Sequence, residues 1–221
     1  MKRFVLLACL FAASPAAAQT HDFQLWTQAI VTAPVAPDWL VHLEAQPRWS
    51  EDASALNQVI ARVALGRRLS PRVSVWGGYA WVPRTLGPGT NHEQRAWQQL
   101  SVTLPAAEKW TPSLRLRTEQ RFLDGWADNS HRLRMMGRGV RPLDAKGTWN
   151  IAVWNEAMVN FDDTTGGPWQ GLDQNRLFGG VMRRLNKEAT LEGGYLWQTM
   201  KAPSAPRAHA HVAFLWLNVV L

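Results

Sequence analysis

The sequence has 221 residues, with 24 lysines and arginines against 17 acids and a formal charge of +7. Residues 1–18 are interpreted as a removable secretory signal, with basic Lys2-Arg3, an apolar stretch from Phe4 to Ala13 and the small-residue cleavage site Ala16-Ala17-Ala18. Cleavage before Gln19 leaves 203 residues with a charge of +5 and no cysteine, since Cys9 leaves with the signal, which excludes a disulfide scaffold, a structural zinc cluster and a thiol enzyme.

A second interpretation of the start concerns Leu6-Leu7-Ala8-Cys9, which resembles a lipoprotein cleavage site. The apolar stretch before Cys9 would then run only from Phe4 to Ala8, shorter than the roughly 7–15 residues of an export signal. We therefore favour a plain signal, and in either case the protein leaves the cytoplasm. The remaining domain, residues 19–221, holds no run of 18 apolar residues, which excludes a helical membrane protein.

The first half of this domain alternates between apolar and polar residues with period 2, which indicates strands. Trp39, Val41 and Leu43 alternate with His42 and Glu44, and the same pattern returns around residues 59–65 and 96–104. Five strands are predicted here, over residues 22–33, 38–49, 56–69, 72–83 and 92–104.

The second half continues the alternation, most clearly between residues 110 and 122. Leu114 and Leu116 share one face with Phe122, whereas Arg115 and Arg117 lie on the other with Glu119 and Arg121. A helix would scatter these charges around its circumference, but a strand sorts them onto two faces. Six further strands are predicted, over residues 111–122, 130–141, 148–160, 172–184, 189–200 and 208–221.

The connectors also alternate, in length. Those at 69–71, 105–109, 142–147 and 186–187 are short, whereas those at 84–91, 123–129, 162–171 and 201–207 are longer and carry glycine or proline. Short turns at one end and longer loops at the other are typical of an outer-membrane barrel, with the longer loops facing outward.

Strand length distinguishes a membrane barrel from a soluble one. In a soluble barrel the charged face lies outside, whereas in a membrane barrel the apolar face meets lipid and the polar face fills the lumen. A membrane strand needs about 9–11 residues, but soluble strands are most often 5–6. Most of these segments have 12–14 residues, which favours the membrane.

Tryptophan is abundant, with 13 residues against two tyrosines. Five tryptophans fall at or near segment ends, where an interfacial aromatic girdle would lie: Trp39, Trp49, Trp81, Trp110 and Trp149. Mid-segment tryptophans such as Trp76, Trp97, Trp154 and Trp216 are instead expected in a core. The last segment places Leu215, Leu217, Val219 and Leu221 on one face, as in a barrel-closing strand, although a plain edge strand would look the same.

An ordered set of short motifs resembles the domain-of-unknown-function 2490 family of bacterial, signal-bearing, outer-membrane-barrel-like proteins. The resemblance implies a barrel and no particular reaction. Its residues span most of the mature chain: 22–26, Glu44, Arg48, 77–79, 93–99, 115–121, 132–134, 155–156, 173–177 and 193–195.

The polar face, assigned to the lumen, carries twice as many arginines as acids. The predicted ladder consists of ten arginines (Arg48, Arg62, Arg95, Arg115, Arg117, Arg121, Arg132, Arg134, Arg138 and Arg176) and five glutamates (Glu44, Glu93, Glu119, Glu156 and Glu192). Unpaired charges would be costly in a small barrel, so Arg–Glu pairs that pack the lumen are the first interpretation. An open lumen that attracts small anionic solutes is the second.

No catalytic or metal-binding constellation emerges, and no cofactor is expected. Ser130 and His131 are adjacent and point to opposite faces, so they cannot pair along one strand. His209 and His211 share a face but have no evident third ligand, and Asp162-Asp163 is read as a solvated turn rather than a calcium site. Gly77-Gly78 and Gly193-Gly194 lie inside strand patterns, which indicates bends or close packing.

The prediction is therefore one all-β domain, an up-and-down antiparallel transmembrane β-barrel of 10–12 strands in the outer membrane of a Gram-negative bacterium. Its expected partners are outer-membrane lipid, the barrel-assembly machinery and small anionic solutes, and not nucleic acid. The role is structural or passive passage of small solutes; a soluble periplasmic ligand-binding barrel and an outer-membrane lipid-modifying enzyme are the alternatives. Eleven segments conflict with an even strand number, so either one strand is missed or the first segment lies partly inside or beyond the barrel.

Overall fold

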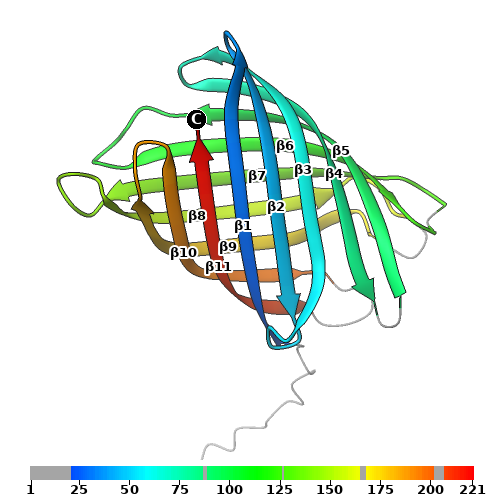
Figure 1. The fold of residues 1–221 in the computed structure, drawn as a ribbon. Helices are drawn as coiled ribbons and strands as arrows, with labels where there is room; N and C mark the ends of the chain where they lie inside the picture. Colours follow the sequence, from blue (N-terminus) through cyan, green and yellow to red (C-terminus); the bar gives the residue numbers. More distant parts are fainter. Residues whose placement is uncertain (1–20, 87–88, 126, 165–167, 202–206) are drawn as a thin grey trace, which may run out of the picture.

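The fold is a closed all-β barrel, seen in a computed structural model that describes residues 21–86, 89–125, 127–164, 168–201 and 207–221 (Figure 1). The predicted signal and its predicted cleavage site lie outside the described residues. The strands are β1 (His21–Ala36), β2 (Trp39–Ser50), β3 (Ala55–Ser70), β4 (Val73–Leu86), β5 (Gly89–Thr103), β6 (Thr111–Leu123), β7 (Ser130–Pro142), β8 (Trp149–Asn160), β9 (Gly171–Arg184), β10 (Ala189–Met200) and β11 (Ala208–Val220). Within the described ranges, no helix is long and apolar enough to cross a membrane.

The predicted barrel is confirmed, and each predicted segment corresponds to one strand. Each strand pairs antiparallel with its neighbours in the chain, as an up-and-down barrel requires. The prediction that the odd count reflects a missed or displaced strand is wrong. Instead, β1 pairs with β11 in parallel, with His21 opposite His209 and Thr32 opposite Val220 (Figure 1, blue beside red). With an odd number of alternating strands, the first and last point the same way, so they close the barrel in parallel.

The two ends of the barrel differ in their connectors. The turn end comprises 37–38, 71–72, 104–110, 143–148, 185–188 and the C-terminus; at the loop end lie the ends of β2, β4, β6, β8 and β10 and the starts of β1, β3, β5, β7, β9 and β11. The predicted long loop over 84–91 is wrong, because β4 continues to Leu86 and β5 begins at Gly89, paired as one hairpin. The other long connectors predicted from the sequence do lie at one end.

The interior contains two apolar clusters. The larger cluster lies on β1 and β7–β11 and includes Trp26, Trp154, Phe178 and Phe214; the smaller lies on β3–β5 and includes Ile60 and Trp97. Phe214 packs edge-on against Trp26, Trp154 and Phe178, with ring centroids 5.8–6.5 Å apart. Charged side chains occupy the interior between these clusters, and this charged region is the candidate site.

Candidate functional site

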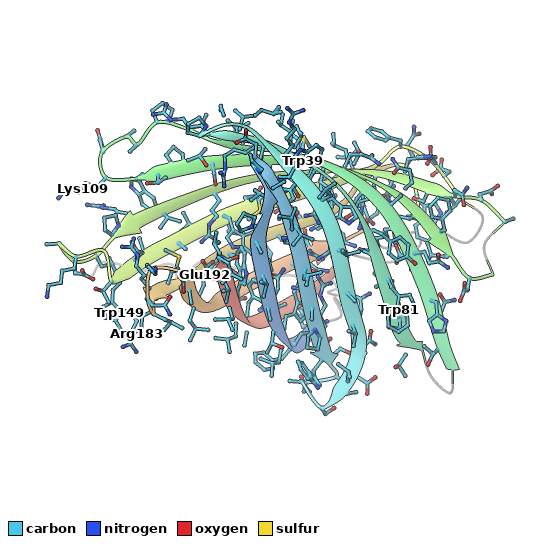
Figure 2. The ribbon with its side chains drawn as sticks, turned by 45° about the horizontal axis from the view of Figure 1, so that its top comes forward. Trp39, Trp81, Lys109, Trp149, Arg183 and Glu192 are labelled. Carbon is cyan, nitrogen blue, oxygen red and sulfur yellow. The ribbon has the colours of Figure 1, made fainter. Side chains whose placement is uncertain are left out.

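The candidate site is the polar part of the barrel interior, built by alternate residues of β2–β10. All 15 residues of the predicted ladder point inward: 12 are buried, and Arg48, Arg115 and Arg138 are partly buried. They reach the same space because strand alternation places every second residue on one face and closure of the sheet turns that face inward. Figure 2 shows Glu192 among the side chains within the barrel.

A continuous ion-pair network joins β6, β7, β8 and β9. Arg134 donates to Glu119 Oε1 at 2.9 Å and to Glu156 at 2.8 Å, so it bridges the two carboxylates. Glu156 also accepts from Arg115 at 2.6 Å and from Arg176 at 3.5 Å, while Glu119 accepts from Arg132 at 2.5 Å. Each carboxylate thus accepts hydrogen bonds from several planar guanidinium groups at once. This geometry offsets the desolvation cost of burying the charges.

Three further glutamates hold arginines outside this network. Glu93 accepts from Arg95 and from Arg121, both at 2.6 Å, and lies 3.2 Å from Arg84. Glu44 pairs with Arg62 on the neighbouring strand and accepts from Gln28 at 2.8 Å. Arg138 on β7 donates to Glu192 on β10 at 2.8 Å, and since these strands are not neighbours the contact reaches across the lumen.

Two interior arginines, Arg48 and Arg117, make no ion pair among the described residues. Arg48 donates to the amide oxygens of Gln58 and Gln46 at 3.0 and 2.7 Å, and its guanidinium lies 3.7 Å from the ring centroid of Trp26. Arg117 donates twice to Gln99 Oε1 and lies 4.3 Å from the ring centroid of Trp97. Amide oxygens and aromatic faces attract these cations but leave their net charge uncompensated.

Two cavities lie inside the barrel, one toward each end. The turn-side cavity, of about 230 Å³, reaches Thr32 and Asn218; the loop-side cavity, of about 320 Å³, reaches Asp22 and Met200. Five side chains line both cavities and therefore lie between them: Trp26, Arg48, Arg62, Arg134 and Arg176. We call these five residues the middle layer, because they line both cavities.

Several interior residues were not identified from the sequence. Arg84 belongs to the Glu93 cluster but lies in a segment predicted as a loop, although its alternation with Ala80 and Val82 was a usable signal. Asp173 lies 3.6 Å from Arg132 beside the register shift between β8 and β9, where simple alternation fails. Trp26 lies in the motif 22–26 of the family resemblance, but it was not predicted as an interior residue, since no charge pattern marks it.

The five end tryptophans lie near the two ends of the barrel. Trp39, Trp81 and Trp149 are exposed on the outer wall, and Trp49 and Trp110 are half-buried. In Figure 2, Trp149 lies with Arg183 and Lys109 at one end, and Trp81 lies toward the other. Arg67 and Arg183 stack over Trp39 and Trp149 at 5.6 and 5.2 Å from the ring centroids.

The histidines considered for catalysis lie on the outer wall. Ser130 is buried, whereas His131 is exposed and lies 2.7 Å from Asp162, so the two do not pair. The parallel seam brings His21 next to His209 and His211, which was not predicted, and Tyr195 Oη lies 2.6 Å from His211 Nδ1.

No group of three or more His, Cys, Asp or Glu residues in the described part of the chain is arranged to hold a metal ion. Asp163 accepts from the backbone N–H of Gln170 at 2.7 Å, so this acid supports its own loop.

Comparison with known proteins gives a family match and one relative. The model of the family described as "Protein of unknown function (DUF2490)" matches residues 23–209. An uncharacterised protein of Methylorubrum extorquens is 30% identical over 215 residues, which cover 96% of this chain and 94% of that protein. No solved structure matches the chain with significance.

Proposed function

Since the chain belongs to the DUF2490 family of proteins of unknown function and its fold is a closed β-barrel, we propose a role from the barrel itself. It is an outer-membrane protein whose strands cross the bilayer and whose lumen is closed by the middle layer. The role is structural, with at most slow passage of small solutes, and it includes no covalent chemistry.

The inverted polarity of the wall is the observation that supports this proposal. On β6, the outward Leu116 is 46% exposed, whereas the inward Arg117 and Glu119 are 4% and 1% exposed. The other strands repeat the pattern, with exposed outward residues such as Leu43, Val63, Met135 and Leu215. Water would make this arrangement costly, since charges are buried and many large apolar side chains are left exposed, but lipid favours it.

Several polar side chains on the outer wall, which would face lipid, form hydrogen bonds with one another. Gln98 accepts from Thr118 at 2.8 Å and exchanges hydrogen bonds with Gln120, and Asn155 pairs with Asn175 at 3.0 Å. Charged residues on the outward face of the strands are Arg67, Arg141 and Arg183, all at the turn end. Arginine beside exposed tryptophan fits the headgroup level of a membrane, where its charge remains hydrated.

Membrane placement is tested by fractionating cells that produce the full chain. The protein is expected in the outer-membrane fraction after an alkaline carbonate wash, and to migrate differently in SDS gels when heated and unheated. Lipid and the barrel-assembly machinery are then its partners, the latter acting on the apolar strand β11. Recovery of the mature chain from the soluble periplasm would overturn this and favour a periplasmic ligand-binding barrel.

Closure of the lumen is tested separately in planar bilayers. The purified protein is expected to produce no steady conductance, because Trp26 and four arginines lie between the two cavities. Steady single-channel currents would show that the middle layer opens in a bilayer, and the protein would then be a solute channel.

A further inference from the structure

We propose that the turn-side cavity is a binding site for a small organic anion, a carboxylate with an apolar body. This site goes beyond the proposed membrane role, and its chemistry depends on the lumen alone. Binding and membrane insertion can therefore fail independently of each other.

The first reason is an excess of cations around this cavity. The two interior arginines without an ion pair in the described structure, Arg48 and Arg117, line it, together with Arg62, Arg115, Arg134 and Arg176. The lining acids are Glu44 and Glu156. Both are already engaged, since Glu44 pairs with Arg62 and Glu156 with Arg115, Arg134 and Arg176. The charges of Arg48 and Arg117 thus remain for a ligand.

The second reason is a set of buried donors without acceptors. Four buried N–H groups have no hydrogen-bond partner among the described residues and belong to side chains that line this cavity: Arg48 Nε, Arg62 Nε, Trp154 Nε1 and Trp216 Nε1. A buried donor without an acceptor costs free energy, so such groups normally have one. All four are donors, which suits a ligand rich in acceptor oxygens, such as a carboxylate.

The third reason is the chemistry of the two walls. One side, from β1 and β7–β11, supplies the apolar lining residues, among them Ile30, Met136, Trp154, Leu196 and Phe214, together with the charged Arg134, Glu156 and Arg176. The other, from β2, β3, β5 and β6, carries Arg48, Arg62, Arg115 and Arg117 with amide side chains. An amphipathic anion can place its carboxylate on the cationic wall and its body on the aromatic one. A volume of about 230 Å³ restricts the ligand to a small molecule.

The turn end is also the more basic end of the barrel. Nine exposed basic residues lie in or beside its turns (Arg67, Arg68, Arg72, Lys109, Arg141, Lys146, Arg183, Arg184 and Lys187), against the four acids Asp38, Glu108, Asp144 and Glu188. The loop end instead carries acids such as Glu51, Asp52, Asp124 and Asp163. This asymmetry directs anions toward the turn end, the end on which the cavity lies.

Calorimetric titration of the full mature protein in a non-ionic detergent tests the site, with benzoate as the probe. Benzoate is expected to bind and to change the tryptophan fluorescence, since Trp154 and Trp216 line the cavity. Benzyl alcohol has the same ring without the charge, and acetate has the charge without the ring. Each is expected to bind at least about tenfold more weakly, a loss of 1.4 kcal/mol or more.

Three substitutions test the site, and Arg117 and Arg84 each line one cavity only. Arg48→Gln and Arg117→Gln are each expected to weaken benzoate about tenfold or more without lowering the thermal midpoint of the free protein, since each removes an interior cation that has no ion pair in the described structure. Arg84→Gln is the control, because Arg84 lines the loop-side cavity but not the turn-side one; benzoate affinity is expected to be unchanged.

Two outcomes would overturn the site. Equal binding of benzoate and benzyl alcohol would show an apolar cavity with no anion preference. Unchanged benzoate affinity in both Arg48→Gln and Arg117→Gln would place any bound anion elsewhere.

Discussion

At the residue scale, Glu156 is the carboxylate with the most cationic partners in the interior network. It holds Arg115, Arg134 and Arg176, which come from three different strands. Removing one partner from a buried ion pair leaves uncompensated charge and costs about 3–5 kcal/mol. Glu156→Gln is therefore expected to lower the free energy of unfolding by this amount, measured by urea unfolding in lipid vesicles.

The matched control is Glu188→Gln at the turn end. Glu188 forms a 3.4 Å pair with Lys187, whose side chain is almost fully exposed, and exposed pairs contribute little. Its unfolding curve is expected to match that of the unchanged protein. If Glu156→Gln also left the curve unchanged, the network would not contribute to stability.

Asp144 gives a pH-dependent prediction outside the strands. Backbone N–H groups of Trp149 and Thr148 donate to its carboxylate at 2.6 and 3.1 Å and hold its pKa below the ordinary value of 3.8. The stabilisation is complete above the unfolded pKa and is lost as the pH falls through the lower folded pKa. Amide hydrogen exchange at Trp149, corrected for the intrinsic rate, is expected to lose protection as the pH falls below about 3.8.

Asp144→Asn is the control for this turn. Its amide oxygen still accepts a hydrogen bond but does not titrate, so protection of Trp149 is expected to be lower and independent of pH in the same range. Loss of protection at acidic pH in both proteins would assign the effect to another group.

At the element scale, the two glycines in the middle of β4 have opposite surroundings. A Cβ on Gly78 would lie 2.5 Å from Val63 O and from the Trp97 ring, whereas one on Gly77 would meet nothing within 4 Å. The sequence predicts close packing at this glycine pair. The prediction applies to Gly78, where a side chain would collide with β3 and β5. Gly78→Val is expected to lower the free energy of unfolding by about 1–3 kcal/mol.

Gly77→Val makes the same change on the same strand, β4, without the collision. Residue 77 points outward and valine favours strands. Gly77→Val is therefore expected to raise the free energy of unfolding by no more than about 1 kcal/mol. Both variants are compared by urea unfolding. A larger loss for Gly77→Val than for Gly78→Val would contradict the inward placement of Gly78.

At the scale of the whole molecule, the parallel seam between β1 and β11 closes the barrel. Ala29 lies opposite Leu217 in this register, and Ala213 lies opposite Leu25. Residues 19–221 hold no cysteine, so a pair introduced there by Ala29→Cys and Leu217→Cys can form one disulfide, because facing residues are close enough to bridge. Oxidation is expected to cross-link this variant, detected as a mobility shift in a non-reducing gel.

Ala29→Cys with Ala213→Cys is the control, since these positions are offset by four residues in the same register. This variant is expected to stay reduced under the same oxidation. Cross-linking of the offset pair in place of the facing pair would rule out the parallel register.

The sequence alone determined the strands and which face of each is polar, because alternation with period 2 is a local property of the chain. It therefore predicted the barrel, and it named the 15 charged residues that the structure places inside. The prediction was wrong near residues 84–91, where glycine and proline suggested a long loop although the alternation continues to Arg84 and the strands pair as far as Leu86 and Gly89.

Only the tertiary structure decided which charges meet. Arg138 and Glu192 are 54 residues apart and touch across the lumen, and His21 meets His211 across 190 residues because the barrel closes in parallel. The unpaired state of Arg48 and Arg117 likewise depends on distances between many strands. Pairing follows from register and closure, which are long-range, whereas the face of a residue follows from its immediate neighbours.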